Sequence, residues 1–280
     1  MGRLAFLVDT VNTARWILHA HKPPLRGEVL RGYLKLRFQH TRLRRFLKAG
    51  SKKQELVGFT VECIHPALLE YMFEEIFVRR DYGFGADTAS PHIIDCGSNI
   101  GLSVLFFKRL YPEATVVAFE PDPQAFAVLR ANIENNHLTA VEAHNKAVLD
   151  APGTSEFYVD AEMPGSLCMS TRAGRHGTRA CTVECVALSE FVNGTVDFLK
   201  LDIEGAEHVV LEELARKGKL HNIKKMVVEY HHHIDPEEDN LSKTLRLLED
   251  HGFGYQLACG QSRPFVGHLF ADILLYAYQK

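Results

Sequence analysis

The chain has 280 residues, of which 46% are hydrophobic, and it carries a formal net charge of −3 at pH 7. This is an ordinary globular composition with enough apolar sequence for a sizeable core. Apolar runs stay well below the roughly 20 residues of a bilayer span, and Asp9 interrupts the apolar start before it can form a signal-peptide core. We therefore expect a soluble, cytoplasmic protein.

The six cysteines are scattered along the chain and lack the regular spacing of a disulfide scaffold, so we expect them to be reduced. Cys181 and Cys185 lie four residues apart near His176, which resembles half of a zinc site. A second pair of ligands does not accompany them, and we expect no zinc there.

Charge is distributed unevenly. Residues 1–54 carry 13 Lys and Arg against Asp9 and Glu28, a net charge of +11, which leaves −14 for residues 55–280. Apolar residues recur near helical spacing around Leu4–Leu18 and Leu43–Leu47, on either side of Pro23-Pro24. We expect a basic helical appendage over residues 1–54. Packing on the main domain or a second subunit, as in a homodimer, is favoured over peripheral contact with a membrane surface.

The remaining sequence alternates strands and helices. Strands are predicted at 56–63, 93–96, 115–120, 141–148, 155–159, 182–188, 196–202 and 224–230, and helices at 66–80, 122–136, 205–216 and 238–251, with a further helix after Gly101. Two closing strands, from Phe253 and from Ala271, have no helix between them. The pattern predicts an α/β fold with a mostly parallel sheet and an antiparallel hairpin at its edge.

A glycine turn is the most informative local feature. The sequence Asp95-Cys-Gly97-Ser-Asn99-Ile-Gly101 reads as the end of a strand, a turn that brings the backbone close to a ligand, and the start of a helix. Glu120 ends the next strand, where a carboxylate binds the ribose of a nucleoside cofactor. The spacing differs from the G-x-G-x-x-G that suits a pyrophosphate, so we expect S-adenosylmethionine rather than NAD.

A second group of polar residues follows two later strands. Alternation exposes Lys200, Asp202 and Glu204 at the end of one strand, and the next delivers Glu229 and His231 to the same rim. His231 is the predicted general base, with Glu229 behind it and His233 as the second choice. In the purely structural alternative, Lys200 pairs with Asp202 or Glu207, and the acids favour the helix N-terminus.

The same rim offers oxygen ligands to a metal. Asp202, Glu204 and Glu229, together with His231, can hold a hard divalent cation such as Mg²⁺ or Ca²⁺. Acid–base chemistry without a metal is simpler, so a metal is not expected. The segment Tyr82-Gly-Phe-Gly is either a linker or an aromatic piece that closes over a ligand.

In this combination of motifs the sequence resembles the FkbM family of S-adenosylmethionine-dependent methyltransferases over about residues 55–280. The motifs are Ile94-Asp-Cys-Gly-Ser-Asn-Ile-Gly101, Ala118-Phe-Glu-Pro121, Asn145-Lys-Ala-Val148, Phe198-Leu-Lys-Leu-Asp-Ile-Glu-Gly-Ala-Glu207 and Val228-Glu-Tyr-His231. The resemblance implies a class I methyltransferase fold with a seven-stranded sheet, and O-methylation of a hydroxyl on a sugar, glycan or natural product.

The resemblance also implies roles for individual residues. Asp95, Gly97, Ser98, Asn99 and Gly101 would surround the methionine moiety, Glu120 the ribose, and Asn145 and Ala147 the adenine. Lys200 or Asp202 would hold the acceptor or the amino-acid part of the cofactor.

Two other functions stay open at this point. The basic segment would suit an RNA methyltransferase, although it lacks interleaved aromatic residues, which makes a nucleic-acid partner unlikely. A noncatalytic binding protein on the same fold is the second alternative. The acceptor itself depends on loops such as 160–180 and 260–268, and the basic segment would fit an anionic or lipid-linked one.

Overall fold

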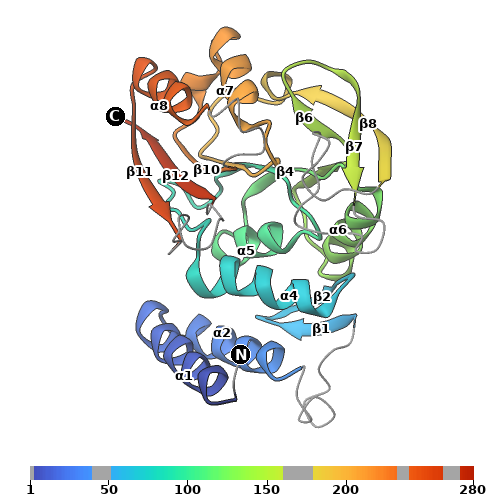
Figure 1. Cartoon of the computed structure of the whole chain (residues 1–280), viewed down its shortest axis with the longest axis vertical. Coiled ribbons are helices and arrows are strands. Elements are labelled where there is room, and N and C mark those ends of the chain that lie inside the picture. Colours follow the sequence, from blue (N-terminus) through green and yellow to red (C-terminus); the bar gives the residue numbers. More distant parts are fainter. Residues whose placement is uncertain (1–2, 40–51, 160–178, 232–239, 261–271) are drawn as a thin grey trace.

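The computed structural model describes residues 3–39, 52–159, 179–231, 240–260 and 272–280. Its centre is a seven-stranded sheet in the order β11-β12-β10-β9-β3-β4-β5 (Figure 1). The five parallel strands are β3 (His92–Cys96), β4 (Thr115–Phe119), β5 (Val141–His144), β9 (Phe198–Leu201) and β10 (Lys225–Tyr230). At one edge, β12 (Ile273–Gln279) runs antiparallel to both β10 and β11 (Phe253–Cys259), which confirms the predicted hairpin edge.

The central strands are apolar on both faces because helices cover both. Ile93 and Ile94 are adjacent in β3, so they point to opposite sides of the sheet and belong to different hydrophobic clusters. One cluster includes residues of α4 (Pro66–Phe73), α5 (Leu102–Leu110) and α6 (Pro123–Asn135). The other includes residues of α7 (Glu207–Arg216) and α8 (Leu241–Asp250), together with the short turns η2 (Leu188–Glu190) and η3 (Leu220–Asn222).

Two predictions for the strands were wrong. The predicted strand 141–148 is two strands, since the chain leaves the main sheet after His144 and continues as β6 (Ala147–Leu149). β6 joins β7 (Gly153–Val159) and β8 (Arg179–Ala187) in a separate three-stranded sheet of order β6-β8-β7. A further strand parallel to β5 in the main sheet would need a crossover connection, usually a helix. No helix was predicted between residues 141 and 196.

The predicted strand 56–63 is instead part of a hairpin. β1 (Lys53–Leu56) pairs antiparallel with β2 (Phe59–Glu62), and Val57 and Gly58 between them both have positive φ, of 48° and 85°. Two consecutive positive φ values are the requirement of a tight two-residue hairpin turn. Val57 is β-branched, and such side chains normally avoid this region, so no hairpin turn was predicted there.

The N-terminal segment contains α1 (Arg3–Ala20) and α2 (Leu25–Arg37), which lie next to α4 at one end of the molecule (Figure 1). The predicted helix around Leu43–Leu47 lies outside the described residues, and α2 was not predicted. Val29, Tyr33 and Leu36 of α2 are buried in the same cluster as Phe73 of α4. By contrast, α1 leaves several apolar side chains exposed: Leu7, Val8, Val11, Trp16 and Leu18.

The helix predicted over 66–80 changes its winding part-way. α4 continues directly into η1, a π-helix over Glu74–Arg79. Short π-helical turns are rare and are frequently found at functional sites. None of the described helices is both long enough and apolar enough to cross a membrane.

Candidate active site

A cavity of about 500 Å³ opens at the carboxyl ends of β3, β4, β9 and β10. This is where open α/β sheets bind ligands, and the volume suits a small molecule. The glycine turn and the polar rim predicted from the sequence both contribute to its wall. The lining residues among those predicted are Gly97, Ser98, Asn99, Glu120, Ala147, Lys200, Asp202, Glu204, Glu229 and His231.

The glycine turn fits against the end of β9 with no space for a side chain. Gly97 has φ of 85°, and a Cβ built on it would lie 1.8 Å from the backbone oxygen of Asp202. Gly101 has φ of 84°, and its Cβ would lie 2.5 Å from Leu129 of α6. Both positions therefore favour glycine for conformation, and Gly97 also requires it for space, because the atom that it would meet belongs to the backbone. Gly101 itself does not line the cavity.

Glu120 is buried at the end of β4 and organises the turn across from it. Its carboxylate accepts hydrogen bonds from the backbone N–H groups of Asn99 and Asp122, each at 2.8 Å. Burial raises the pKa of Glu120 to about 8, although the two amides oppose the shift. The side chain of Asn145 donates to the backbone oxygens of Glu120 and Pro121, so Asn145 supports this strand end without lining the cavity.

Lys200 joins the turn to the polar rim. Its ammonium donates to the backbone oxygen of Gly97 at 2.8 Å and to Asp202 Oδ2 at 3.0 Å, and it lies 3.5 Å from Asp95. Burial lowers the pKa of Lys200, but the two carboxylates outweigh it and raise that pKa above its ordinary value. Asp95 is fully buried and does not line the cavity, and it also accepts a hydrogen bond from the hydroxyl of Ser103, which does line it. The predicted Lys200–Asp202 pair is thus present, in a buried setting rather than an exposed one.

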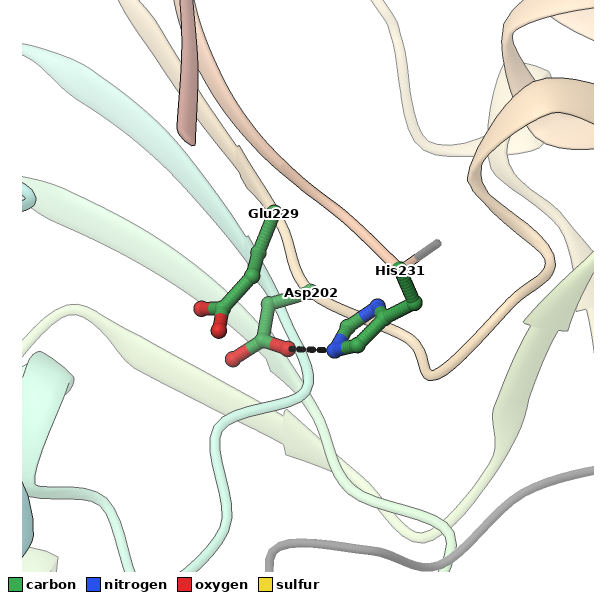
Figure 2. Close-up of side chains that lie close together, drawn as sticks. All are labelled: Asp202, Glu229 and His231. Atoms are coloured by element: carbon green, nitrogen blue, oxygen red, sulfur yellow. Dashed lines mark ion pairs between the residues drawn. The ribbon is translucent and has the colours of Figure 1, made fainter. Parts of the chain in front are cut away.

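Asp202, Glu229 and His231 come together from the ends of β9 and β10, as Figure 2 shows. The partner that orients the imidazole differs from the predicted one. Nδ1 of His231 lies 2.8 Å from Glu207 Oε1, so Glu207 at the start of α7, and not Glu229, stands behind the ring. Nε2 faces Glu204 Oε2 at 3.4 Å and Asp202 Oδ1 at 3.9 Å.

These carboxylates control the charge of the cluster. Burial lowers the pKa of His231, but Glu207, Glu204 and Asp202 outweigh burial and raise that pKa to about 10. Burial, together with the charge of Asp202, raises the pKa of Glu229 well above its ordinary value. In the absence of a bound cation, the cluster therefore retains protons at neutral pH.

Two more polar side chains line the cavity: Tyr82, which lies in the segment predicted to be either a linker or a cover over a ligand, and Glu75, which was not predicted. Tyr82 donates to Asp202 at 3.4 Å and to Glu229 at 3.3 Å, and stacking of Phe84 on Phe198 anchors its segment. This supports the reading of Tyr82-Gly-Phe-Gly as a piece that covers the site. Glu75 enters the cavity from the π-helix η1, and burial raises its pKa to about 7. A π-turn has no recognised sequence signal, so Glu75 could not be predicted.

A family model described as the methyltransferase FkbM domain matches residues 95–255. The chain belongs to the FkbM methyltransferase family. The seven-stranded sheet with its antiparallel edge is the class I methyltransferase architecture that the resemblance implies. The prediction of an S-adenosylmethionine-dependent methyltransferase is confirmed at this family level.

Several known methyltransferases are similar to this chain. Methyltransferase 1 of Beauveria bassiana is 31% identical over 173 residues, which cover 52% of this chain and 67% of the relative. The 31-O-demethyl-FK506 methyltransferase FkbM of Streptomyces tacrolimicus is 28% identical over 229 residues, covering 70% of this chain and 86% of the relative. A solved FkbM methyltransferase from Methylobacillus flagellatus aligns with 17% identity and a TM-score of 0.46, covering 76% of this chain and 54% of that one. The chain thus spans about half of that solved protein.

The FkbM match has a boundary that matters for the site. It contains the glycine turn, Glu120 and the whole cluster around His231. It does not contain Glu75 or Tyr82, which reach the cavity from residues before the matched region. His232 and His233 lie outside the described residues, so the second-choice base stays a prediction.

Proposed function

We propose that this FkbM methyltransferase transfers a methyl group from S-adenosylmethionine to a hydroxyl oxygen of a sugar, glycan or natural product. The observation that carries the proposal is a single cavity whose wall holds two chemically distinct groups of residues. The first is the glycine turn with Glu120, here called the cofactor end, and the second is Asp202, Glu229 and His231, here called the acceptor end. A cofactor bound by the first group and an acceptor bound by the second would meet inside one cavity.

The first end has the features that a phosphate-free nucleoside requires. Gly97 has no side chain, so the turn packs closely against the backbone of Asp202 and presents its own backbone to the cavity. The buried carboxylate of Glu120 can accept hydrogen bonds from ribose hydroxyls. When bound there, S-adenosylmethionine supplies an electrophilic methyl group on its positively charged sulfonium sulfur. The turn residues Gly97, Ser98 and Asn99 would receive its amino-acid part, and Ala147 its adenine.

The second end can position a hydroxyl and manage its proton. Positioning is the larger contribution when the leaving group is good. His231 stays our predicted base, and Nε2 is its nitrogen on the side of Asp202 and Glu204. Because its pKa is about 10, this nitrogen accepts a proton only after nearby positive charge has displaced the one it holds. Lys200 is engaged by Gly97 and Asp202, which favours a supporting role for it.

The wall of the cavity is partly apolar, with Leu68, Met72, Ile76 and Phe157 in its lining. This supports an acceptor with an apolar body and a few hydroxyls. The name of the Streptomyces relative, a 31-O-demethyl-FK506 methyltransferase, supports transfer to oxygen. An anionic or lipid-linked acceptor that also meets the basic N-terminal segment is part of the same proposal.

Calorimetric titration with S-adenosylmethionine, S-adenosylhomocysteine and NAD tests the cofactor, with Glu120→Ala as the control. We expect binding of the first two, weakened by the substitution, and no binding of NAD. Transfer of labelled methyl from S-adenosylmethionine to a panel of glycosides and polyketides, compared with their O-methylated forms, tests the acceptor class. Label on nitrogen or carbon only, or binding of NAD alone, would overturn the proposal.

A further inference from the structure

We propose that Asp202, Glu229 and His231 bind a divalent metal cation inside the cavity. One ligand atom from each residue can be chosen so that all three lie within 4.8 Å of one another. Two ligands of one ion, each about 2.1 Å from it, are separated by roughly 3–4 Å. Asp202 Oδ1 and His231 Nε2 are 3.9 Å apart, longer than a hydrogen bond and close to that separation.

The imidazole is set up as a ligand by its other nitrogen. Nδ1 lies 2.8 Å from Glu207 Oε1, and both side chains are almost completely buried. A carboxylate at Nδ1 fixes the proton on that nitrogen and directs the lone pair of Nε2 outward, the arrangement that supports metal-binding histidines. Nε2 faces the carboxylates of Asp202 and Glu204 (Figure 2 shows the first), so the lone pair is aimed into the cluster.

The two carboxylate ligands are also held from behind. Asp202 uses Oδ2 for Lys200 and Tyr82, which leaves Oδ1 on the side of His231. Tyr82 donates to Oε2 of Glu229 from the same hydroxyl. Hydrogen bonds of this kind orient ligands and are a regular part of metal sites. Of the four residues that the sequence analysis named for a cation, the structure groups Asp202, Glu229 and His231, and Glu204 lies beside them.

The balance of charge favours a cation at this point. The carboxyl groups of Glu204 and Glu207 lie around His231, in addition to those of Asp202 and Glu229. The ammonium of Lys200 already pairs with Asp202 and donates to the backbone of the glycine turn. Partly buried carboxylates that face one another without enough positive charge are costly. A divalent ion would supply that charge. Two oxygens and one imidazole nitrogen suit Mn²⁺ and related ions better than an all-oxygen Mg²⁺ site.

Three protein ligands leave other coordination positions open. In the context of the proposed function, on which this step rests, an acceptor oxygen would occupy one of them. With the ion bound, Nε2 of His231 is a ligand and no longer available as the base, so His231 would hold the ion instead of accepting the proton. The binding of the ion itself does not depend on which acceptor is used.

Titration of the purified, chelator-treated protein with Mn²⁺ tests the site. Binding is measured by electron paramagnetic resonance as the loss of the signal of free Mn²⁺. We expect one ion per chain. Glu229→Gln and His231→Ala should weaken binding by roughly tenfold or more, and Glu207→Gln by about 10- to 100-fold, as for other supporting carboxylates. Glu134→Gln, on the exposed outer part of α6, is the matched control and should bind like the wild type.

Binding of S-adenosylhomocysteine, measured in EDTA, shows for each variant that the fold and the cofactor end are intact. Absence of Mn²⁺ binding in a protein that binds S-adenosylhomocysteine would overturn the cation site and leave the proposed function standing. Mn²⁺ binding that Glu229→Gln and His231→Ala leave unchanged would also overturn it. Mn²⁺ binding sensitive to both substitutions, in a protein that does not bind S-adenosylhomocysteine, would support the site and contradict the proposed function.

Discussion

Glu207 Oε1 lies 2.8 Å from Nδ1 of His231, which joins the first turn of α7 to the end of β10. The same carboxylate accepts from the backbone N–H groups of Ile203 and Gly205, so it also fixes the turn that follows β9. Two strand ends of the active site thus depend on one buried acid. The imidazole is oriented by a residue for which the sequence pattern predicted a place at a helix N-terminus or a pair with Lys200, and no contact with His231.

Glu207→Gln should lower the pKa of His231 from about 10, because a neutral amide replaces the strongest of the carboxylates that raise it. The raised pKa stabilises the fold fully below about pH 6.5, and this stabilisation is lost as the pH rises through about 10. The variant should lose about 1.5–3 kcal/mol at pH 6, and less as the pH is raised. Histidine titration by NMR and denaturant unfolding at several pH values measure both effects.

The matched control is Glu212→Gln. Glu212 pairs with His208 one turn further along α7, and its side chain is mostly exposed. It should leave the His231 titration unchanged and cost at most about 0.5 kcal/mol. An unaltered His231 pKa in Glu207→Gln would contradict the assignment of Glu207 as the orienting residue.

Affinity for S-adenosylhomocysteine should increase as the pH rises from 7 to 9. Glu120 has a pKa of about 8, and its ionised form is the better acceptor for ribose hydroxyls. The Glu120→Gln variant should bind more weakly and lose this pH dependence. The same raised pKa means that the unfolding free energy of the wild type falls as the pH rises from about 4.5 to about 8, relative to that of the variant. Calorimetric titration with S-adenosylhomocysteine between pH 7 and 9 measures the affinity of both proteins. The same pH dependence in the wild type and in Glu120→Gln would refute the role of Glu120.

Gly97→Ala should abolish S-adenosylhomocysteine binding and destabilise the protein by several kcal/mol. Its Cβ would lie 1.8 Å from the backbone oxygen of Asp202, so the turn or the end of β9 must move. Gly58→Ala is the control with the same φ of 85° and open space around the new Cβ. It should cost only the conformational strain, about 1–2 kcal/mol, and leave binding intact. Equal effects of the two substitutions on binding would contradict close packing of the turn.

Leu36→Ala should destabilise the protein by about 2–5 kcal/mol, as expected for a buried leucine in a shared core. Leu36 of α2 is 0% exposed in the cluster that also contains α4 and α5 residues, whereas Leu18 of α1 is 43% exposed. Leu18→Ala should therefore change stability by less than about 0.5 kcal/mol. Thermal and denaturant unfolding of both variants give the comparison. A small effect at Leu36 would show that α2 is dispensable to the core.

The sequence by itself determined the features that depend on neighbouring residues. Gly97 and Gly101 mark a turn between strand and helix, Glu120 ends the next strand, and alternation places Asp202 and Glu204 on one rim. Each of these follows from local backbone geometry, because the period of a strand or the conformation of a glycine is fixed within a few residues. The antiparallel edge also followed locally, from two strands with no helix between them.

Tertiary structure alone decided which side chains meet. Glu207 stands behind His231, and Tyr82 and Glu75 reach the same cavity from segments far away in sequence. Lys200 is buried between the turn and the rim although alternation placed it at an open edge. The physical reason is that spacing fixes the face of an element that a side chain occupies. The packing of α7, η1 and the glycine turn against the strand ends decides which opposing groups share that face.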